Sequence, residues 1–281
     1  MNRKTEISER VLALIKAARD GDEDSVFQWL RGCRNEIDTC DDTHDKYNAL
    51  HYAAEKGHLG VLKMLLLAGA DVNYRSGDRI EDEGEITFQP GHTPLILAAR
   101  YSRPEAAELL LSANADPHIR SEQSWTALHA AAVGGNLAVV ENLLSMKVDH
   151  SVMSYGRHFD EELGWYFFNT PMHAAAANGK SDIVACLLKH GASPLECWID
   201  KRTPIFYAAA EELQDNEFVE SLSMAYLQAH HEAGAEPCYD PNDDDQIKCL
   251  NEEAANYLRY WRENIVRGLE QSVARKANPS S

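Results

Sequence analysis

Hydrophobic and small residues recur along the chain in one short pattern, in which a large apolar residue is followed three and four positions later by two alanines. The copies begin at Leu50, Leu95, Leu128, Met172 and Ile205, with a weaker copy at Leu14. From Leu14 onward, the intervals between these residues are 36, 45, 33, 44 and 33 positions. A period in this range is typical of stacked repeats. The spacing therefore predicts a solenoid in which each unit packs against its neighbours.

Each copy predicts two helices and a loop, and residues 47–76 show this best. The first apolar run is short, contains a pair of alanines, and ends at Gly57. The second run has apolar residues at helical spacing and ends at Gly69, a residue type that commonly terminates helices. The polar segment 71–76 is typical of a loop. One unit is thus predicted to contain a helix, a turn, a second helix and a loop.

This unit resembles the ankyrin repeat family. The residues that carry the resemblance are Leu50-His51, Ala53-Ala54, Gly57-His58, Leu65-Leu66 and Gly69-Ala70-Asp71-Val72-Asn73. Other copies begin with Thr93-Pro94-Leu95, Thr126-Ala127-Leu128-His129 and Thr170-Pro171-Met172-His173. The resemblance implies an all-α solenoid of helix-turn-helix units with protruding hairpin fingers. Its concave face would be built from the fingers and the first helices.

The resemblance also implies roles for several polar residues. His51, His129 and His173 occupy the position at which the family uses histidine to form hydrogen bonds between fingers. His58 would pair with the glycine between two helices. Asn73 is similar to the asparagine that oxygen-dependent hydroxylases modify in ankyrin proteins, which would make the chain a substrate of such an enzyme.

We expect a repeat array over 1–238. Its repeats fall at about 8–41, 44–76, 89–121, 122–154, 166–198 and 199–238. Residues 239–281 follow the array, and within them 243–276 has an amphipathic apolar stripe. This stripe predicts a C-terminal helix that caps the last repeat, with a docking helix for another chain as the alternative.

Two intervals are longer than the repeat, and the extra residues fall in finger loops at 77–88 and 155–165. Both insertions place acidic residues before a glycine and β-prone residues after it, which predicts two lengthened hairpins. They are either tolerated surface excursions or extensions of one groove wall. The aromatic run from Trp165 and Tyr166 to Phe168 would contact either a partner or the neighbouring finger.

Charge and cysteine usage narrow the class of partner and the compartment. The net charge of −18, from 27 basic and 45 acidic residues, opposes binding to nucleic acid backbones and to anionic membranes. No apolar run approaches the length of a membrane span, and Met1 to Arg10 does not resemble a secretory signal. The six cysteines include no CxxC pair, which favours a reduced compartment, the cytoplasm or the nucleus.

The resemblance projects a set of arginines, aromatic residues and other polar groups onto the concave groove. They are Arg19, Tyr47, Glu55, Lys56, Arg75, His92, Arg100, Tyr101, Arg120, Trp125, Asn178 and Arg202. Arginine and aromatic residues are frequent in binding hot spots, and arginine matches carboxylates and phosphates. We therefore expect a groove for an acidic or phosphorylated segment of a protein partner, in a chain that is monomeric alone. The alternative is a set of scattered, solvated charges.

No catalytic or cofactor motif accompanies the repeats. Cys33, Cys40 and His44 lie close in sequence but match no usual zinc spacing, and neither insertion has calcium-loop spacing. His158 with its acidic neighbours is a dense ionisable group, yet no nucleophile, metal or phosphate-binding motif surrounds it. We expect a non-enzymatic scaffold, adaptor or inhibitor without a metal or cofactor. The alternatives are an effector or pathway accessory protein, or a catalyst built on the inserted fingers.

Overall fold

The computed structural model describes residues 9–33, 36–41, 46–77, 80–82, 85–87, 91–121, 124–156, 167–194 and 204. Within these residues the chain forms ten helices and two short β-hairpins, which confirms the expected helical repeat fold. The chain divides into two units. The first comprises Met1–Arg157 with Tyr166–Pro171, and the second comprises His158–Trp165 with Met172–Ser281.

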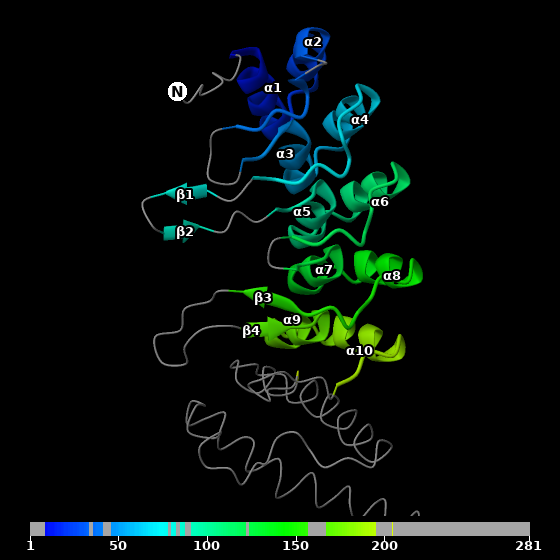
Figure 1. Ribbon diagram of the computed structural model, residues 1–281. Helices are drawn as coiled ribbons and strands as arrows, with labels where there is room; N and C mark the ends of the chain where they lie inside the picture. The colour runs from blue at the N-terminus through cyan, green and yellow to red at the C-terminus, as the bar shows by residue number, and fades with distance from the viewer. Residues whose placement is uncertain are drawn as a thin grey trace, which may run out of the picture. The chain divides into compact units, whose positions relative to one another are not determined.

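The helices of the first unit form two rows. The inner row consists of α1 (Glu9–Asp20), α3 (Ala49–Lys56), α5 (Pro94–Arg100) and α7 (Ala127–Gly134). The outer row consists of α2 (Glu23–Cys33), α4 (Leu59–Leu67), α6 (Pro104–Ser112) and α8 (Leu137–Ser145). Each helix packs against the next one of its own row and against its partner in the same repeat (Figure 1).

Small residues explain the close stacking of the inner row. Ala53, Ala98 and Ala131 are fully buried, as are the alanines that follow them. An alanine loses no side-chain conformational freedom on burial, and its small size lets helix backbones approach closely. The outer helices bury only one face, for example Val61, Leu62 and Leu65 of α4. The alanine pairs therefore set the inner row, and a leucine stripe attaches each outer helix.

The inner helices begin and end with strong local signals. Asn48 caps α3 by accepting a hydrogen bond from the His51 backbone at 3.0 Å, while its own N–H donates to His51 Nδ1 at 3.4 Å. Thr126 and His129 form the same reciprocal cap on α7. Gly57 follows α3 with φ +78°, a conformation that glycine adopts without the steric cost of a side chain. These caps fix the repeat boundaries in the sequence.

Two hairpins project from the first unit on the side of the inner row (Figure 1). Strand β1 (Ile80–Asp82) pairs antiparallel with β2 (Glu85–Thr87), and Ile80 lies opposite Thr87. Strand β3 (Ser154–Gly156) pairs antiparallel with β4 (Phe167–Asn169). The prediction that both insertions lengthen a hairpin is confirmed for these strands. Their tips, 83–84 and 157–166, lie outside the described residues.

The second unit contains α9 (Pro171–Ala177) from Met172 onward and α10 (Ser181–Lys189). Met172, Ile183 and Leu187 are buried, with at most 1% of each side chain exposed. Of the expected sixth repeat only Pro204 is described, and the helix predicted over 243–276 lies outside the described residues. Within the described part of the chain, no helix has the length and apolar character needed to cross a bilayer.

Candidate functional site

An arginine held between two aromatic rings lies at the end of α5. The Cζ atom of Arg100 lies 5.9 Å from the ring centre of Tyr101 and 5.7 Å from that of Trp125. Trp125 comes from the next repeat, immediately before the residue that caps α7. Both distances lie within the range of cation–π contacts. We call Arg100, Tyr101 and Trp125 the Arg100 cluster.

The finger before α7 holds Trp125 in place. The Trp125 N–H donates to Ser121 Oγ at 3.0 Å, and the Ser121 N–H donates to the Trp125 carbonyl at 2.8 Å. The Trp125 ring also stacks on the buried His129, with 6.3 Å between ring centres and 20° between planes. The indole is thus fixed by both its backbone and its ring. A fixed aromatic ring loses little conformational entropy when a partner binds.

The Arg100 guanidinium is exposed and has no carboxylate within 4.0 Å among the described residues. By contrast, Lys56 Nζ pairs with Glu55 at 2.6 Å, and Arg19 pairs with Asp20 at 3.8 Å. Among the described residues, Arg100 thus forms no ion pair. Its contacts with the two rings orient the guanidinium without using its N–H donors.

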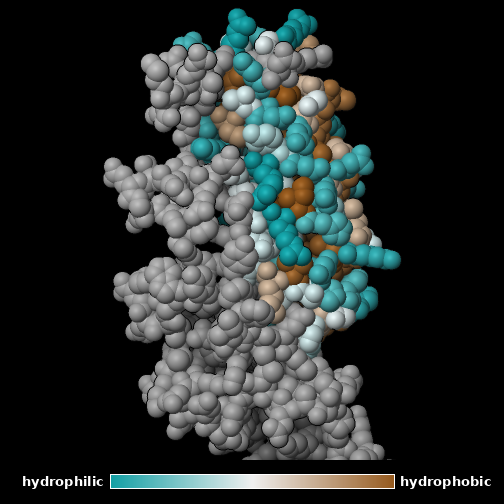
Figure 2. Space-filling view, viewed as in Figure 1, coloured by the Kyte–Doolittle hydropathy of each residue, from teal (hydrophilic) through white to brown (hydrophobic). Residues whose placement is uncertain are grey.

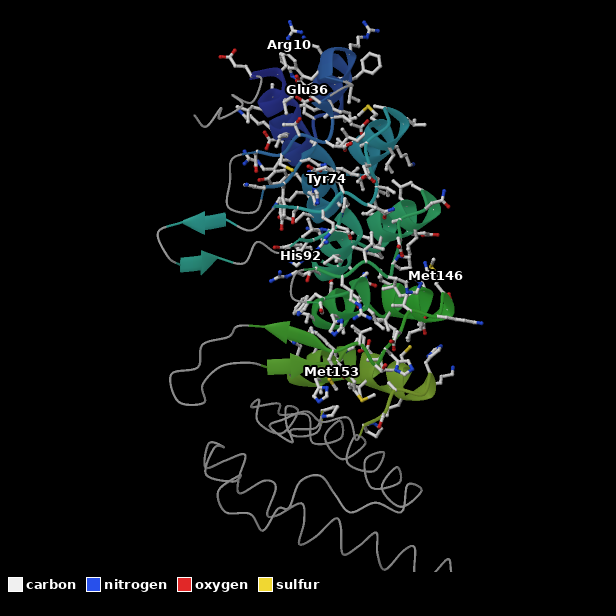
Figure 3. All side chains as sticks on the ribbon, in the orientation of Figure 1. Arg10, Glu36, Tyr74, His92, Met146 and Met153 are labelled. Atoms are coloured by element: carbon white, nitrogen blue, oxygen red, sulfur yellow. The ribbon has the colours of Figure 1, made fainter. Side chains whose placement is uncertain are left out.

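Two residues projected onto the groove lie in the interior instead. His92 is 3% exposed and Tyr47 is 6% exposed. Figure 3 shows Tyr74 at α3 and His92 at α5. The His92 N–H donates to Ser76 Oγ at 2.9 Å, and its carbonyl accepts from the Ser76 N–H at 2.8 Å. These contacts hold His92 between adjacent fingers. Because the side chains of His92 and Tyr47 are both buried, neither is presented to a partner.

Burial and a neighbouring charge keep the His92 ring neutral. Burial is the largest cause that lowers the His92 pKa, to about 3. Repulsion by Arg100, and by His51 once its ring is protonated, adds to this shift. Burial is also the main reason that the His51 pKa is lowered to about 4. Both side chains are therefore uncharged at neutral pH.

The remaining predicted groove residues are more scattered. The Arg75 Nε–H donates at 3.5 Å to the carbonyl of Gly91, the residue before His92. Arg120 is exposed, and its charge adds to the Ser151 hydrogen bonds that lower the Asp149 pKa. Trp165, Tyr166 and Arg202 lie outside the described residues. The sequence did not single out Tyr52, whose ring lies 5.9 Å from the Arg19 guanidinium.

Polar side chains tie successive repeats together. The His51 Nε2–H donates to the His92 carbonyl at 2.9 Å, which confirms the expected bond between fingers. The His58 Nε2–H donates to the Arg19 carbonyl at 3.1 Å, and its ring packs against Gly21 of the preceding repeat. Asn73 Oδ1 accepts from the Asp116 N–H at 2.8 Å. These residues therefore have structural roles, each linking one repeat to another.

The described residues contain no group of three metal-binding side chains. Burial raises the pKa of the Cys40 thiol, so at neutral pH it is not a reactive thiolate. His44 lies outside the described residues, as does the side chain of Cys33.

A model of ankyrin repeats matches residues 2–76 and 78–154, and a model of a single ankyrin repeat matches 168–197. The chain belongs to the ankyrin repeat family. Ankyrin repeats are protein–protein interaction modules, and the repeat array of this chain is one.

Curated relatives of the chain have diverse names. A probable E3 ubiquitin-protein ligase, XBOS32, from Oryza sativa subsp. japonica is 29% identical over 213 residues, covering 68% of this chain and 40% of the relative. The ankyrin repeat and SOCS box protein 16 of Mus musculus is 33% identical over 182 residues, covering 52% and 36%. Palmitoyltransferase AKR1 of Kluyveromyces lactis is 26% identical over 133 residues, covering 47% and 16%. The chain thus spans two fifths or less of each of these relatives.

Proposed function

We propose that the chain binds an acidic or phosphorylated segment of a protein partner at the Arg100 cluster. The observation that carries this proposal is the exposed arginine between two rings, with no acidic neighbour among the described residues. A guanidinium presents planar donors that match carboxylate or phosphate oxygens. The aromatic contacts favour a fixed orientation of those donors, and this reduces the entropy lost on binding.

The acidic character of the chain supports selectivity at this position. With a net charge of −18, most of the surface repels an acidic segment, whereas the Arg100 cluster attracts it locally. Arg75 and Arg120 supply further positive charge on neighbouring fingers. The paired strands β1–β2 and β3–β4 of the two extended fingers would form one wall of the same surface. We expect the partner segment to lie along the inner row with its acidic residue at Arg100.

The proposal assigns recognition, and no catalysis, to this chain. Relatives named as a ligase and as a palmitoyltransferase are more than twice as long as the region they share with it. We infer a scaffold, adaptor or inhibitor that works in a reducing intracellular compartment, monomeric when alone. The cysteine usage supports the compartment, and the repeat family supports the mode of action.

Fluorescence anisotropy on the full chain tests the site. The probes are three short labelled peptides that share their apolar residues and carry glutamates, phosphoserines or lysines at the remaining positions. Wild type should prefer the two acidic peptides. Arg100→Glu should weaken their binding about tenfold, because a charge-assisted hydrogen bond contributes about 1.5–3 kcal/mol.

Lys189→Glu is the matched control, since Lys189 is also exposed and lies in the last turn of α10, outside both proposed binding surfaces. It changes the net charge equally and should leave the affinity for these peptides unchanged. Equal weakening by both variants would attribute binding to net charge and would contradict the proposal. Unchanged binding after charge reversal at Arg75, Arg100 and Arg120 together would also contradict it.

A further inference from the structure

An apolar groove runs between two helices of the outer row, away from the Arg100 cluster. It has a volume of about 530 Å³ and is lined by Phe27, Leu30, Arg31, Met64, Leu67 and Ala68. Leu67 is 87% exposed and Phe27 is 57% exposed. Figure 2 shows hydrophobic residues on this side of the first unit. We call this feature the α2–α4 groove.

Packing between the repeats does not explain why an apolar residue occupies the exposed position of Leu67. Helix α4 attaches to the inner row through Val61, Leu62 and Leu65, which are fully buried. Leu67 follows this face and contributes almost nothing to the core. An apolar surface rarely remains exposed in a contiguous patch on a soluble monomer unless it binds something. The groove therefore calls for a comparison with the same positions of the other repeats.

The register of the repeats makes that comparison direct. Positions are counted from the turn residue that follows the inner helix of each repeat, namely Gly21, Gly57, Ser102 and Gly135. The sixth and tenth residues after this turn residue belong to the outer helix and are exposed in all four repeats. In the first two repeats they are Phe27 and Arg31, then Lys63 and Leu67. In the next two they are Glu108 and Ser112, then Glu141 and Ser145. The same face is thus apolar and basic in repeats one and two but acidic and polar in repeats three and four.

The charges at the groove indicate what would fill it. Arg31 and Lys63 are exposed, and neither has a carboxylate within 4.0 Å among the described residues. Glu23 and Asp24 lie in the first turn of α2, whereas Arg31 lies in its last turn and Lys63 lies in the middle of α4. A chain of net charge −18 thus carries a local basic and apolar patch. Such a patch is complementary to an apolar surface with acidic residues at one edge.

We propose that an amphipathic α-helix of a protein partner docks in the α2–α4 groove. Its apolar residues, spaced i, i+3, i+4 and i+7, contact Phe27, Met64 and Leu67, the usual manner in which a helix occupies a groove. Acidic residues beside that stripe pair with Arg31 and Lys63. The surface is separate from the Arg100 cluster, so the chain carries two independent binding faces and can bridge two partners.

The test uses the full chain and a synthetic helix with a leucine stripe flanked by glutamates. Two further peptides serve as probes: one with scrambled order and one with lysines in place of the glutamates. Wild type should bind the glutamate helix at least tenfold more tightly than either. The variant Phe27→Glu with Leu67→Ser, which gives the groove the residue types of repeats three and four, should weaken that binding at least tenfold.

The matched control is Ala138→Glu with Met146→Ser. It changes the net charge equally and removes an apolar side chain that is 41% exposed at the end of α8. It should bind the helix as wild type does, and so should Arg100→Glu. Leu67→Ser alone provides a milder variant, since this side chain is almost fully exposed and its replacement leaves the fold intact.

Three results of the peptide assays would overturn the proposal. The first is equal binding of the scrambled helix, and the second is equal binding by the groove variant. The third is a loss of binding in Arg100→Glu, which would place the peptide at the inner surface. Light scattering on wild type addresses a second copy as the occupant. We expect a monomer, and a dimer that the groove variant abolishes would assign the groove to self-association and overturn the docking of a partner helix.

Discussion

The inner and outer helix rows of the first unit belong to the same repeats, yet their sequences are constrained differently. Leu95 to Ala99 in α5 are all buried, because this helix contacts α3, α6 and α7. In the neighbouring α6, Glu105 and Glu108 are exposed. An inner helix must fit several surfaces at once, whereas an outer helix has one face that contacts only water. The inner row therefore preserves the repeat, and the outer row is free to differ between copies.

The sharpest test of this difference lies within one outer helix. Leu65 is fully buried and Leu67 is 87% exposed, although they are two positions apart in α4. Leu65→Ala should lower the free energy of unfolding by about 2–5 kcal/mol, because it leaves a cavity in a packed core. Leu67→Ala should change it by less than about 0.5 kcal/mol, as expected for a surface position.

Urea unfolding followed by circular dichroism measures both values. Similar losses in the two variants would mean that the outer face of α4 is covered and would contradict the comparison. The two substitutions remove the same atoms from the same helix. Any difference between them therefore reports packing and not helix propensity.

The sequence predicted the inner row well because its signals are local. The alanine pair after Leu50, the turn at Gly57 and the histidine at His51 lie within ten residues of one another. Their repetition predicted the helices and the stacked array, and the resemblance to ankyrin repeats implied the bond between fingers. The lengthened hairpins were also predictable, because each insertion interrupts a known spacing.

The binding surfaces could be predicted only in part. Arg100, Tyr101 and Trp125 were all selected from the repeat pattern, but their mutual contact depends on the stacking of two repeats. His92 was selected by the same pattern and is buried, because Ser76 of the preceding finger pairs with its backbone. The α2–α4 groove was missed, since exposure of an apolar residue depends on packing between helices. Comparing equivalent positions of each outer helix would have revealed the change in residue type.

The buried His92, on the inner side of the repeats, should make the free energy of unfolding depend on pH. An unfolded histidine has a pKa of about 6.5, and His92 in the folded chain has a pKa of about 3. As pH falls below 6.5, the unfolded chain binds a proton that the folded chain does not. His92 therefore makes its full contribution to stability above pH 6.5 and loses it as pH falls toward 3. Between pH 7 and 5 this loss amounts to about 2 kcal/mol.

The variant His92→Leu should remove that part of the pH dependence. It retains the backbone bonds to Ser76, and the Nδ1 atom it deletes has no hydrogen-bond partner. Urea unfolding at pH 7 and at pH 5 should show a loss on acidification that is about 2 kcal/mol smaller than in wild type. The control His118→Leu replaces an exposed histidine and should retain the wild-type loss. An unchanged loss in His92→Leu would contradict the assignment.

The smallest expected effect concerns how the outer helices begin. Asn136 caps α8, and its side chain accepts a hydrogen bond from the Val139 N–H at 3.2 Å. His58 and Arg103 hold the same position in α4 and α6 and instead donate to carbonyls of the preceding repeat. Asn136→Ala should therefore lower the free energy of unfolding by about 1 kcal/mol, the usual cost of losing a cap. Asn136→Ser retains an acceptor and should restore most of that stability in the same urea titration, because serine caps helices about as well as asparagine. Equal losses for alanine and serine would mean that Asn136 acts by packing and that the outer row needs no cap at α8.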